Sequence, residues 1–207
     1  MTDGVEDQKR VVVERLYAMF AAPPPSRITG CRCCLDSPKV ARLLRTPLRA
    51  IDRETLWWYA WKAFLTVGDV ADFRYLLPRI LDVSLRHPGD AVDVEIVLGK
   101  LRLAGWAQWS DDERAAIIAA IDLLFDQAVA TVDDPDDGEL AVFEVESVLC
   151  GAARADLDPV RWLERLSQRL RQSLHARLSG APNGFWEDAP VGLAAAHDWL
   201  ACRPVDD

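Results

Sequence analysis

The sequence predicts an all-α protein. Apolar residues recur every three or four positions through most of the 207 residues, the spacing that places side chains on one face of a helix. Glycine, proline and aspartate stand between these stretches, where helices begin and end. No segment alternates apolar and polar residues for long enough to indicate a strand. We therefore expect antiparallel helix pairs, stacked either as a HEAT-like α-α superhelix or as an irregular helical bundle.

The first helix is predicted over residues 5–20 and ends before the three prolines 23–25, which cannot donate backbone hydrogen bonds. A cysteine-containing loop is expected over residues 26–36. Ser37 is the predicted cap of the next, short helix, with Pro38 at its first position, where a missing N–H costs nothing.

The third helix is predicted over residues 51–67, started by Asp52 and ended by Gly68, because glycine readily adopts the left-handed conformation. Asp69 starts the next helix at once. Pro78 lies inside that helix, so we expect a kink or a short break there.

The second half of the chain continues in the same way. A helix over residues 90–104 should end at Gly105, and Ser110 with Glu113 forms a capping box that opens an apolar helix. Further helices are predicted at the end of the chain, over residues 139–154, 160–178 and 191–202, the second of them started by Asp158 and Pro159.

Consecutive predicted helices can be grouped two by two along the chain. This grouping predicts three helix-pair units between residues 52 and 178. Each unit is about 40 to 48 residues long, the length of HEAT-type repeats. We expect residues 1–207 to form a single all-helical domain.

The net charge and the absence of common motifs disfavour several classes of function. The chain has 24 Lys+Arg against 33 Asp+Glu, a net charge of -9, and should repel nucleic-acid backbones. No apolar run is long enough to span a bilayer, and the acidic N-terminus is no secretory signal, so we expect a cytoplasmic protein without a membrane partner. GxGxxG, Walker A, HExxH and GxSxG motifs are absent, which favours a protein that is not an enzyme.

Three of the five cysteines, Cys31, Cys33 and Cys34, lie within four residues and are the candidate metal ligands. Thiolates suit zinc or iron–sulfur clusters, and zinc is the candidate ion. The spacing is tighter than the usual Cys-x2-4-Cys, and adjacent cysteines do not easily direct both sulfurs to one ion. A strained disulfide and a tight turn with packed sulfurs are the alternatives. A fourth ligand would come from Asp36, His87, His175 or His197, although the histidines are isolated in sequence.

Other residues are assigned structural roles. Cys150 and Cys202 lie in apolar helical segments and should be buried as reduced thiols. Asp69, Asp72, Arg74 and Arg79 are expected to form a polar network at a helix junction. The acidic segment 133–138 lacks the spacing of a calcium loop and is predicted to be a solvated turn.

Four aromatic residues cluster within one predicted helix, in the stretch LWWYAWKAF. Trp57 and Trp61 share a face, because they are four residues apart. We expect Trp57, Trp61 and Phe64 in the core. Trp58 and Tyr59 are then the candidates for packing against a neighbouring helix or for binding a partner, since tryptophan and tyrosine dominate binding hot spots.

Three stretches carry a family pattern: residues 27–36 (RITGCRCCLD), 65–81 (LTVGDVADFRYLLPRIL) and 104–117 (AGWAQWSDDERAAI). They resemble segments of a family of uncharacterised bacterial helical proteins with a Gly-Cys-x-Cys-Cys loop. In that family a proline is more usual at the position of Arg32. The resemblance implies a mostly helical fold and a bacterial cytoplasmic origin, and it implies no activity.

Two function hypotheses follow, beside the third possibility of an enzyme with a cleft between helix pairs. The leading one is a non-enzymatic helical scaffold that binds another protein, because stacked helix pairs present a broad surface and the acidic balance suits a basic partner. One version is an immunity-type or antitoxin-like protein. The alternative is a metal- or redox-active protein that uses Cys31, Cys33 and Cys34.

Overall fold

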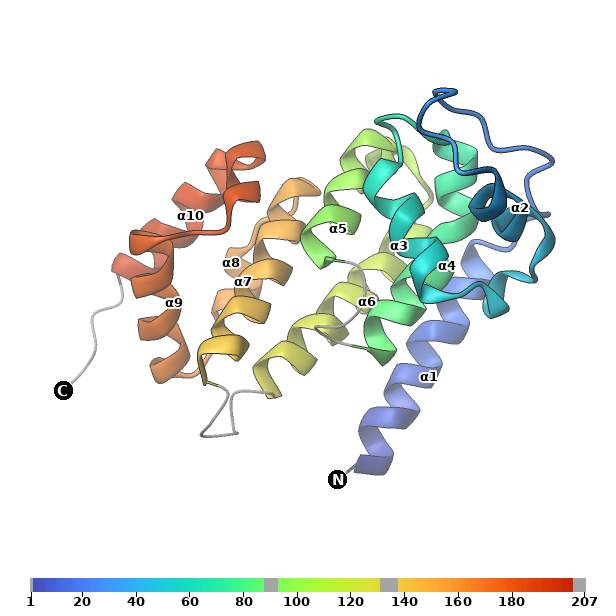
Figure 1. Cartoon of the computed structure of the whole chain (residues 1–207). Helices are drawn as coiled ribbons and strands as arrows, with labels where there is room; N and C mark the ends of the chain where they lie inside the picture. The colour runs from blue at the N-terminus through green and yellow to red at the C-terminus, as the bar shows by residue number, and fades with distance from the viewer. Residues whose placement is uncertain (1, 88–92, 131–137, 203–207) are drawn as a thin grey trace. The chain divides into compact units, whose positions relative to one another are not determined.

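The computed structural model describes residues 2–87, 93–130 and 138–202 (Figure 1). Every regular element in these ranges is a helix, so the all-α prediction is confirmed. The described backbone also contains two isolated β-bridges, Gly30 with Val67 and Ala63 with Val67. The stacking of helix pairs into a HEAT-like superhelix stays a prediction.

The packing divides the chain into two compact units, and the single all-helical domain over residues 1–207 stays a prediction. The first unit comprises residues 1–92 and 100–123, and the second comprises residues 93–99 and 124–207. Counted from the sequence, the first unit has 17 Lys+Arg and 15 Asp+Glu, a net charge of +2, and the second has 7 and 18, a net charge of -11. The acidity of the chain therefore belongs to the second unit.

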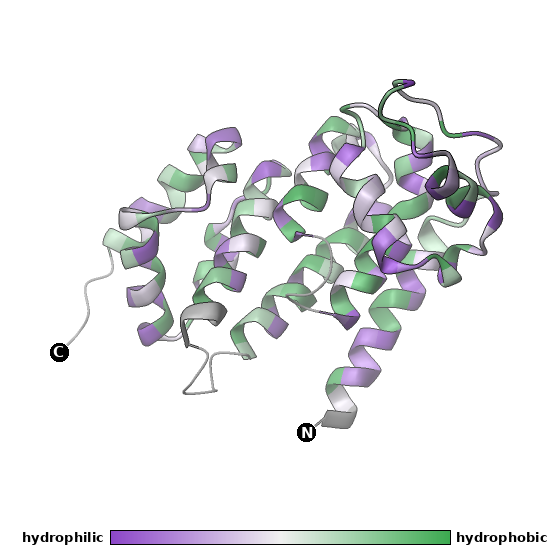
Figure 2. Cartoon of the chain, viewed as in Figure 1, coloured by the Kyte–Doolittle hydropathy of each residue, from purple (hydrophilic) through white to green (hydrophobic). Residues whose placement is uncertain are grey.

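Six helices contribute to the first unit: α1 (Thr2–Met19), α2 (Ser37–Arg45), α3 (Arg53–Lys62), α4 (Val70–Arg86), the end of α5 (Val94–Leu103) and the start of α6 (Asp111–Ala130). Two short 3-10 helices, η1 (Leu48–Ala50) and η2 (Trp106–Gln108), join them. α4 packs against α1 and α3, and α3 packs against α2. α6 is hydrophobic over most of its length, as Figure 2 shows. The core of the first unit includes Leu16, Leu43, Phe73 and Ile80.

The helix starts predicted from local capping chemistry are confirmed at three places. Asp52 accepts a hydrogen bond from the backbone N–H of Thr55 at 2.8 Å. Asp69 caps α4. Ser110 and Glu113 form the predicted capping box: the Ser110 hydroxyl accepts from the backbone N–H of Glu113, and the Glu113 carboxylate accepts from that of Ser110.

One predicted cap is wrong. Asp36, rather than Ser37, precedes the first turn of α2, where its carboxylate accepts a hydrogen bond from the backbone N–H of Lys39 at 3.0 Å. Pro38 is therefore the second residue of α2, one position later than predicted.

The third helix also ends earlier than predicted. α3 ends at Lys62, five residues before Val67, because Phe64 adopts a left-handed conformation with φ of 63°. The Lys62 carbonyl then accepts hydrogen bonds from the three following amides of residues 65–67. Gly68 has the expected positive φ, but it ends this turn rather than the helix.

Two other helical predictions differ from the structure. α4 continues through Pro78, so the short break is absent and the kink stays a prediction; apolar packing buries residues on both sides of the proline. The helix predicted over residues 160–178 is two helices, α8 (Val160–Leu163) and α9 (Gln168–Gly180). Ser167 caps the second of them and so restarts the helix.

The second unit contains α7 (Gly138–Arg154), α8, α9, η4 (Gly184–Asp188) and α10 (Pro190–Ala201), with the remaining parts of α5 and α6. α10 packs against α7, α8, α9 and η4. A fully buried carboxylate, Glu146, ties these elements together: it accepts hydrogen bonds from Arg177, from the backbone N–H of Asn183 at 2.5 Å and from the Trp186 indole at 3.1 Å.

Candidate functional site

The cysteine loop lies between α1 and α2 and is fixed to the turn that follows α3 (Figure 1). The backbone N–H of Cys31 donates to the Thr66 carbonyl at 2.8 Å, and the N–H of Gly68 donates to the Thr29 carbonyl at 2.7 Å. These bonds flank the antiparallel bridge between Gly30 and Val67. The early end of α3 therefore supplies the extended backbone on which the loop docks.

Gly30 permits this docking because it has no side chain. A Cβ at this position would lie 2.4 Å from the Thr66 carbonyl oxygen and 3.1 Å from Cα of Val67. No other residue fits at that distance from a neighbouring backbone. The close approach of the two backbones therefore requires glycine at position 30.

A tight turn then gathers the three sulfurs. The Cys31 carbonyl accepts hydrogen bonds from the N–H groups of Cys34 and Leu35, at 2.9 and 3.0 Å. The Sγ atoms of Cys31 and Cys33 are 2.8 Å apart, and those of Cys33 and Cys34 are 3.7 Å apart. All three lie within 4.8 Å of one another, so the adjacent cysteines do direct their sulfurs to one place.

The contacts within the cluster make the thiols unequal. A hydrogen bond from the Cys33 thiol is the largest cause that lowers the pKa of Cys31 below its ordinary value. The same contact, with a second one to Cys34, raises the pKa of Cys33 to about 11. Cys31 therefore forms a thiolate at a lower pH than Cys33 does. Cys31 and Cys33 are exposed and Cys34 is half-buried, so reagents and ions reach the cluster from solvent.

No fourth protein ligand joins the cluster within the part of the chain that the structure describes: no carboxylate or imidazole shares the 4.8 Å grouping of the three sulfurs. Asp36 is used as the cap of α2. His87 is exposed at the end of α4, and His175 and His197 belong to the second unit. The cluster offers three sulfurs and leaves further coordination positions open.

In the aromatic cluster of α3, the predicted burial of Trp57 and Trp61 is wrong, whereas the buried Trp58 and Tyr59 agree with the alternative in which they pack against a neighbouring helix. Trp58 and Tyr59 are buried, with 7% and 0% exposure, whereas Trp57 and Trp61 are 45% and 38% exposed, with ring centroids 5.9 Å apart. Leu56 and the small Ala60 lie on the buried face, because α3 packs against both α2 and α4. Neither Trp58 nor Tyr59 presents a surface to a partner.

The four residues predicted to form one polar network at a helix junction instead contact separate partners. Asp69 and Asp72 form a capping box at the start of α4. Arg74 pairs with Glu113, and Arg79 donates to Asp82 at 2.9 Å and to a backbone carbonyl. All of these contacts are structural.

The remaining candidates have mixed outcomes. Cys150 is buried as predicted, and burial raises the pKa of its thiol. Cys202 is exposed, so its predicted burial is wrong, because it follows the last turn of α10. Most of the acidic segment 133–138 lies outside the described residues.

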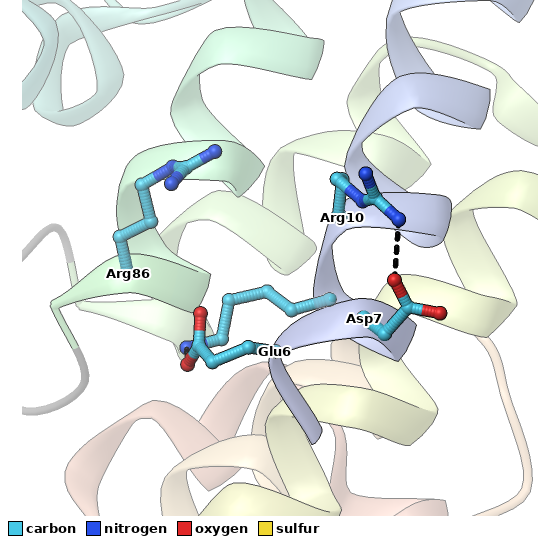
Figure 3. A pocket seen from close by; sticks show the side chains of 5 residues that line it. Glu6, Asp7, Arg10 and Arg86 are labelled. Atoms are coloured by element: carbon cyan, nitrogen blue, oxygen red, sulfur yellow. Dashed lines mark hydrogen bonds and ion pairs between the residues drawn. The ribbon is translucent and has the colours of Figure 1, made fainter. Parts of the chain in front are cut away.

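A shallow hollow of about 430 Å³ lies between the start of α1 and the end of α4 (Figure 3). Its charged side chains are engaged with one another or with the core: Lys9 pairs with Glu6 at 2.8 Å, Arg10 with Asp7, and Arg86 with the buried Asp82 at 2.5 Å. The hollow is therefore lined by surface ion pairs and is a weaker candidate for a functional site than the cysteine cluster.

Comparisons with protein-family models, with curated proteins and with solved structures find no match for this chain. The resemblance to a bacterial helical family stays a prediction. Among the described residues, no helix combines the length and hydropathy needed to cross a membrane.

Proposed function

We propose that this protein binds a thiophilic metal ion of the zinc class through Cys31, Cys33 and Cys34, with the helices of the first unit as the scaffold. The observation that carries the proposal is the convergence of three sulfurs within 4.8 Å on a loop fixed to a second backbone segment. Thiolates are the ligands that select zinc and copper(I) over magnesium and calcium.

The sulfur positions fit such an ion after a small adjustment. Zinc–sulfur bonds of about 2.3 Å in a tetrahedral site place sulfurs about 3.8 Å apart. The 3.7 Å separation of Cys33 and Cys34 agrees with that value. The 2.8 Å separation of Cys31 and Cys33 would open by roughly 1 Å when an ion replaces the shared thiol proton. Water would take the fourth position, because the three sulfurs leave it open.

The test is a zinc titration of reduced protein purified without a polyhistidine tag. We expect one equivalent to bind tightly, with release of protons because the thiols must ionise. A variant with Cys31, Cys33 and Cys34 all changed to serine should lose this binding. Cys202→Ser is the matched control, because Cys202 is also exposed but lies outside the loop. Less than about a tenth of an equivalent bound at saturating zinc would overturn the proposal.

A second candidate is the protein-binding scaffold, including its immunity-type or antitoxin-like version. One observation favours it: the second unit has a net charge of -11, which would draw a basic partner. The exposed pair of Trp57 and Trp61 belongs to the first unit, whose net charge is +2, so it is not part of that acidic surface.

The scaffold hypothesis is tested with a basic model protein such as lysozyme and with co-purified partners. Binding should fall steeply between low and physiological salt, because charge attraction is screened. A complex that is insensitive to salt, or that is lost when Trp57 and Trp61 are replaced by alanine, would place recognition elsewhere and contradict this version.

A further inference from the structure

Two of the three histidines in the chain meet in the second unit, although they come from different helices. The ring of His175 on α9 lies against the ring of His197 on α10, with centroids 5.1 Å apart and planes at 79°. These residues are isolated in sequence, so the fold alone brings them together.

Core packing holds both histidines in place. His175 follows the buried Leu174, and His197 follows the buried Ala196, so each ring lies at the rim of the contact between α9 and α10. Both side chains are half-buried. Side chains on packed helices are better fixed than side chains on loops, which favours a defined site.

A hydroxyl completes the constellation. The Oγ of Ser179 lies 3.2 Å from Nε2 of His197, and Ser179 is one helical turn after His175 on the same face of α9. Within the described ranges, no carboxylate or thiol makes a set of three metal-binding side chains with the two rings. The other positions around an ion would be filled by water.

We propose that His175 and His197 form a second, independent metal site, which takes a borderline divalent ion such as Ni²⁺, Zn²⁺ or Cu²⁺. Neutral imidazole is the ligand these ions share. The terminal torsion of histidine is broad, so small ring rotations can bring one nitrogen of each ring to a common ion. The net charge of -11 on this unit raises the local concentration of cations. Because an ion held in this way joins α9 to α10, its binding also stabilises the second unit.

The test uses Ni²⁺ and the full chain without a polyhistidine tag, in a background where Cys31, Cys33, Cys34 and Cys202 are serine. Calorimetric titration at pH 7.5 should show one equivalent of nickel bound with micromolar affinity. His175→Gln or His197→Gln should weaken binding at least about tenfold, because each removes one of two ligands. His87→Gln is the matched control, since His87 is exposed in the first unit, and it should bind as the parent does.

A thermal unfolding series guards against misfolded variants. Nickel should raise the Tm of the parent and of the His87 variant, and leave the Tm of the other two variants unchanged. Equal nickel affinity in the parent and the His175 variant, or loss of binding in the His87 variant, would overturn the proposal.

Discussion

Gly30→Ala tests whether the cysteine loop is held by the turn after α3. The added Cβ would lie 2.4 Å from the Thr66 carbonyl oxygen, whereas real Cβ contacts essentially never fall below 3.0 Å, so the two backbones must separate. That movement lengthens the hydrogen bonds of 2.8 Å from Cys31 to Thr66 and 2.7 Å from Gly68 to Thr29. Overpacking costs about 1–3 kcal/mol, and each weakened hydrogen bond adds about 1 kcal/mol at most.

We therefore expect Gly30→Ala to lower the free energy of unfolding by about 2–4 kcal/mol and to weaken zinc binding by at least about tenfold. Urea unfolding followed by circular dichroism measures the first quantity, and a zinc titration measures the second. Gly4→Ala is the matched control, because no atom lies within 4 Å of its added Cβ. If Gly30→Ala kept the urea midpoint and the zinc affinity of the parent, the proposed docking of the loop would be refuted.

Three more predictions concern two buried carboxyl groups and the cysteine thiols. Glu146→Ala should destabilise the protein by about 3–5 kcal/mol in urea unfolding, because it leaves the guanidinium of Arg177 without its partner, and Glu146→Gln should cost less. Burial raises the pKa of Asp72 to about 6. The unfolded chain therefore loses this proton first as pH rises, and stability falls by at most about 3 kcal/mol between pH 4 and 7 relative to Asp72→Asn. A thiol reagent should modify Cys31 before Cys33, whose pKa is raised, and Cys150 only as fast as the protein unfolds, because Cys150 is buried.

Each of these three predictions would be contradicted by a specific result. Equal urea midpoints for Glu146→Ala and the parent would show that the hydrogen bonds to the buried carboxylate do not stabilise the protein. A constant stability difference between Asp72→Asn and the parent across the pH range would mean that the carboxyl titrates normally. Rapid modification of all five thiols in the native protein would contradict the burial of Cys150.

The sequence predicts helix starts better than helix ends. The starts at Asp52, Asp69 and Ser110 depend on side chains within three residues of the cap. The neighbouring sequence is therefore sufficient to predict them. The end of α3 depends instead on the left-handed Phe64, an unusual conformation for a bulky residue that no local rule favours. The uninterrupted helix at Pro78 depends on packing against other helices.

The same division applies to the sites. The composition of the loop identifies Cys31, Cys33 and Cys34 as candidates, but the docking of Gly30 on Thr66 joins segments that are far apart in sequence. Periodicity groups Trp57 with Trp61 correctly and cannot tell which face is buried, because that depends on where α2 and α4 lie. Only the fold places His175 beside His197.

The most direct test of the central claim, a three-sulfur metal site in the loop, is zinc X-ray absorption on protein loaded with one equivalent of zinc. The proposed site predicts three sulfur neighbours at about 2.3 Å and one lighter neighbour at about 2.0 Å, with the sulfur signal lost in the triple serine variant. A first shell made only of nitrogen and oxygen would contradict the assignment of Cys31, Cys33 and Cys34 as the metal ligands.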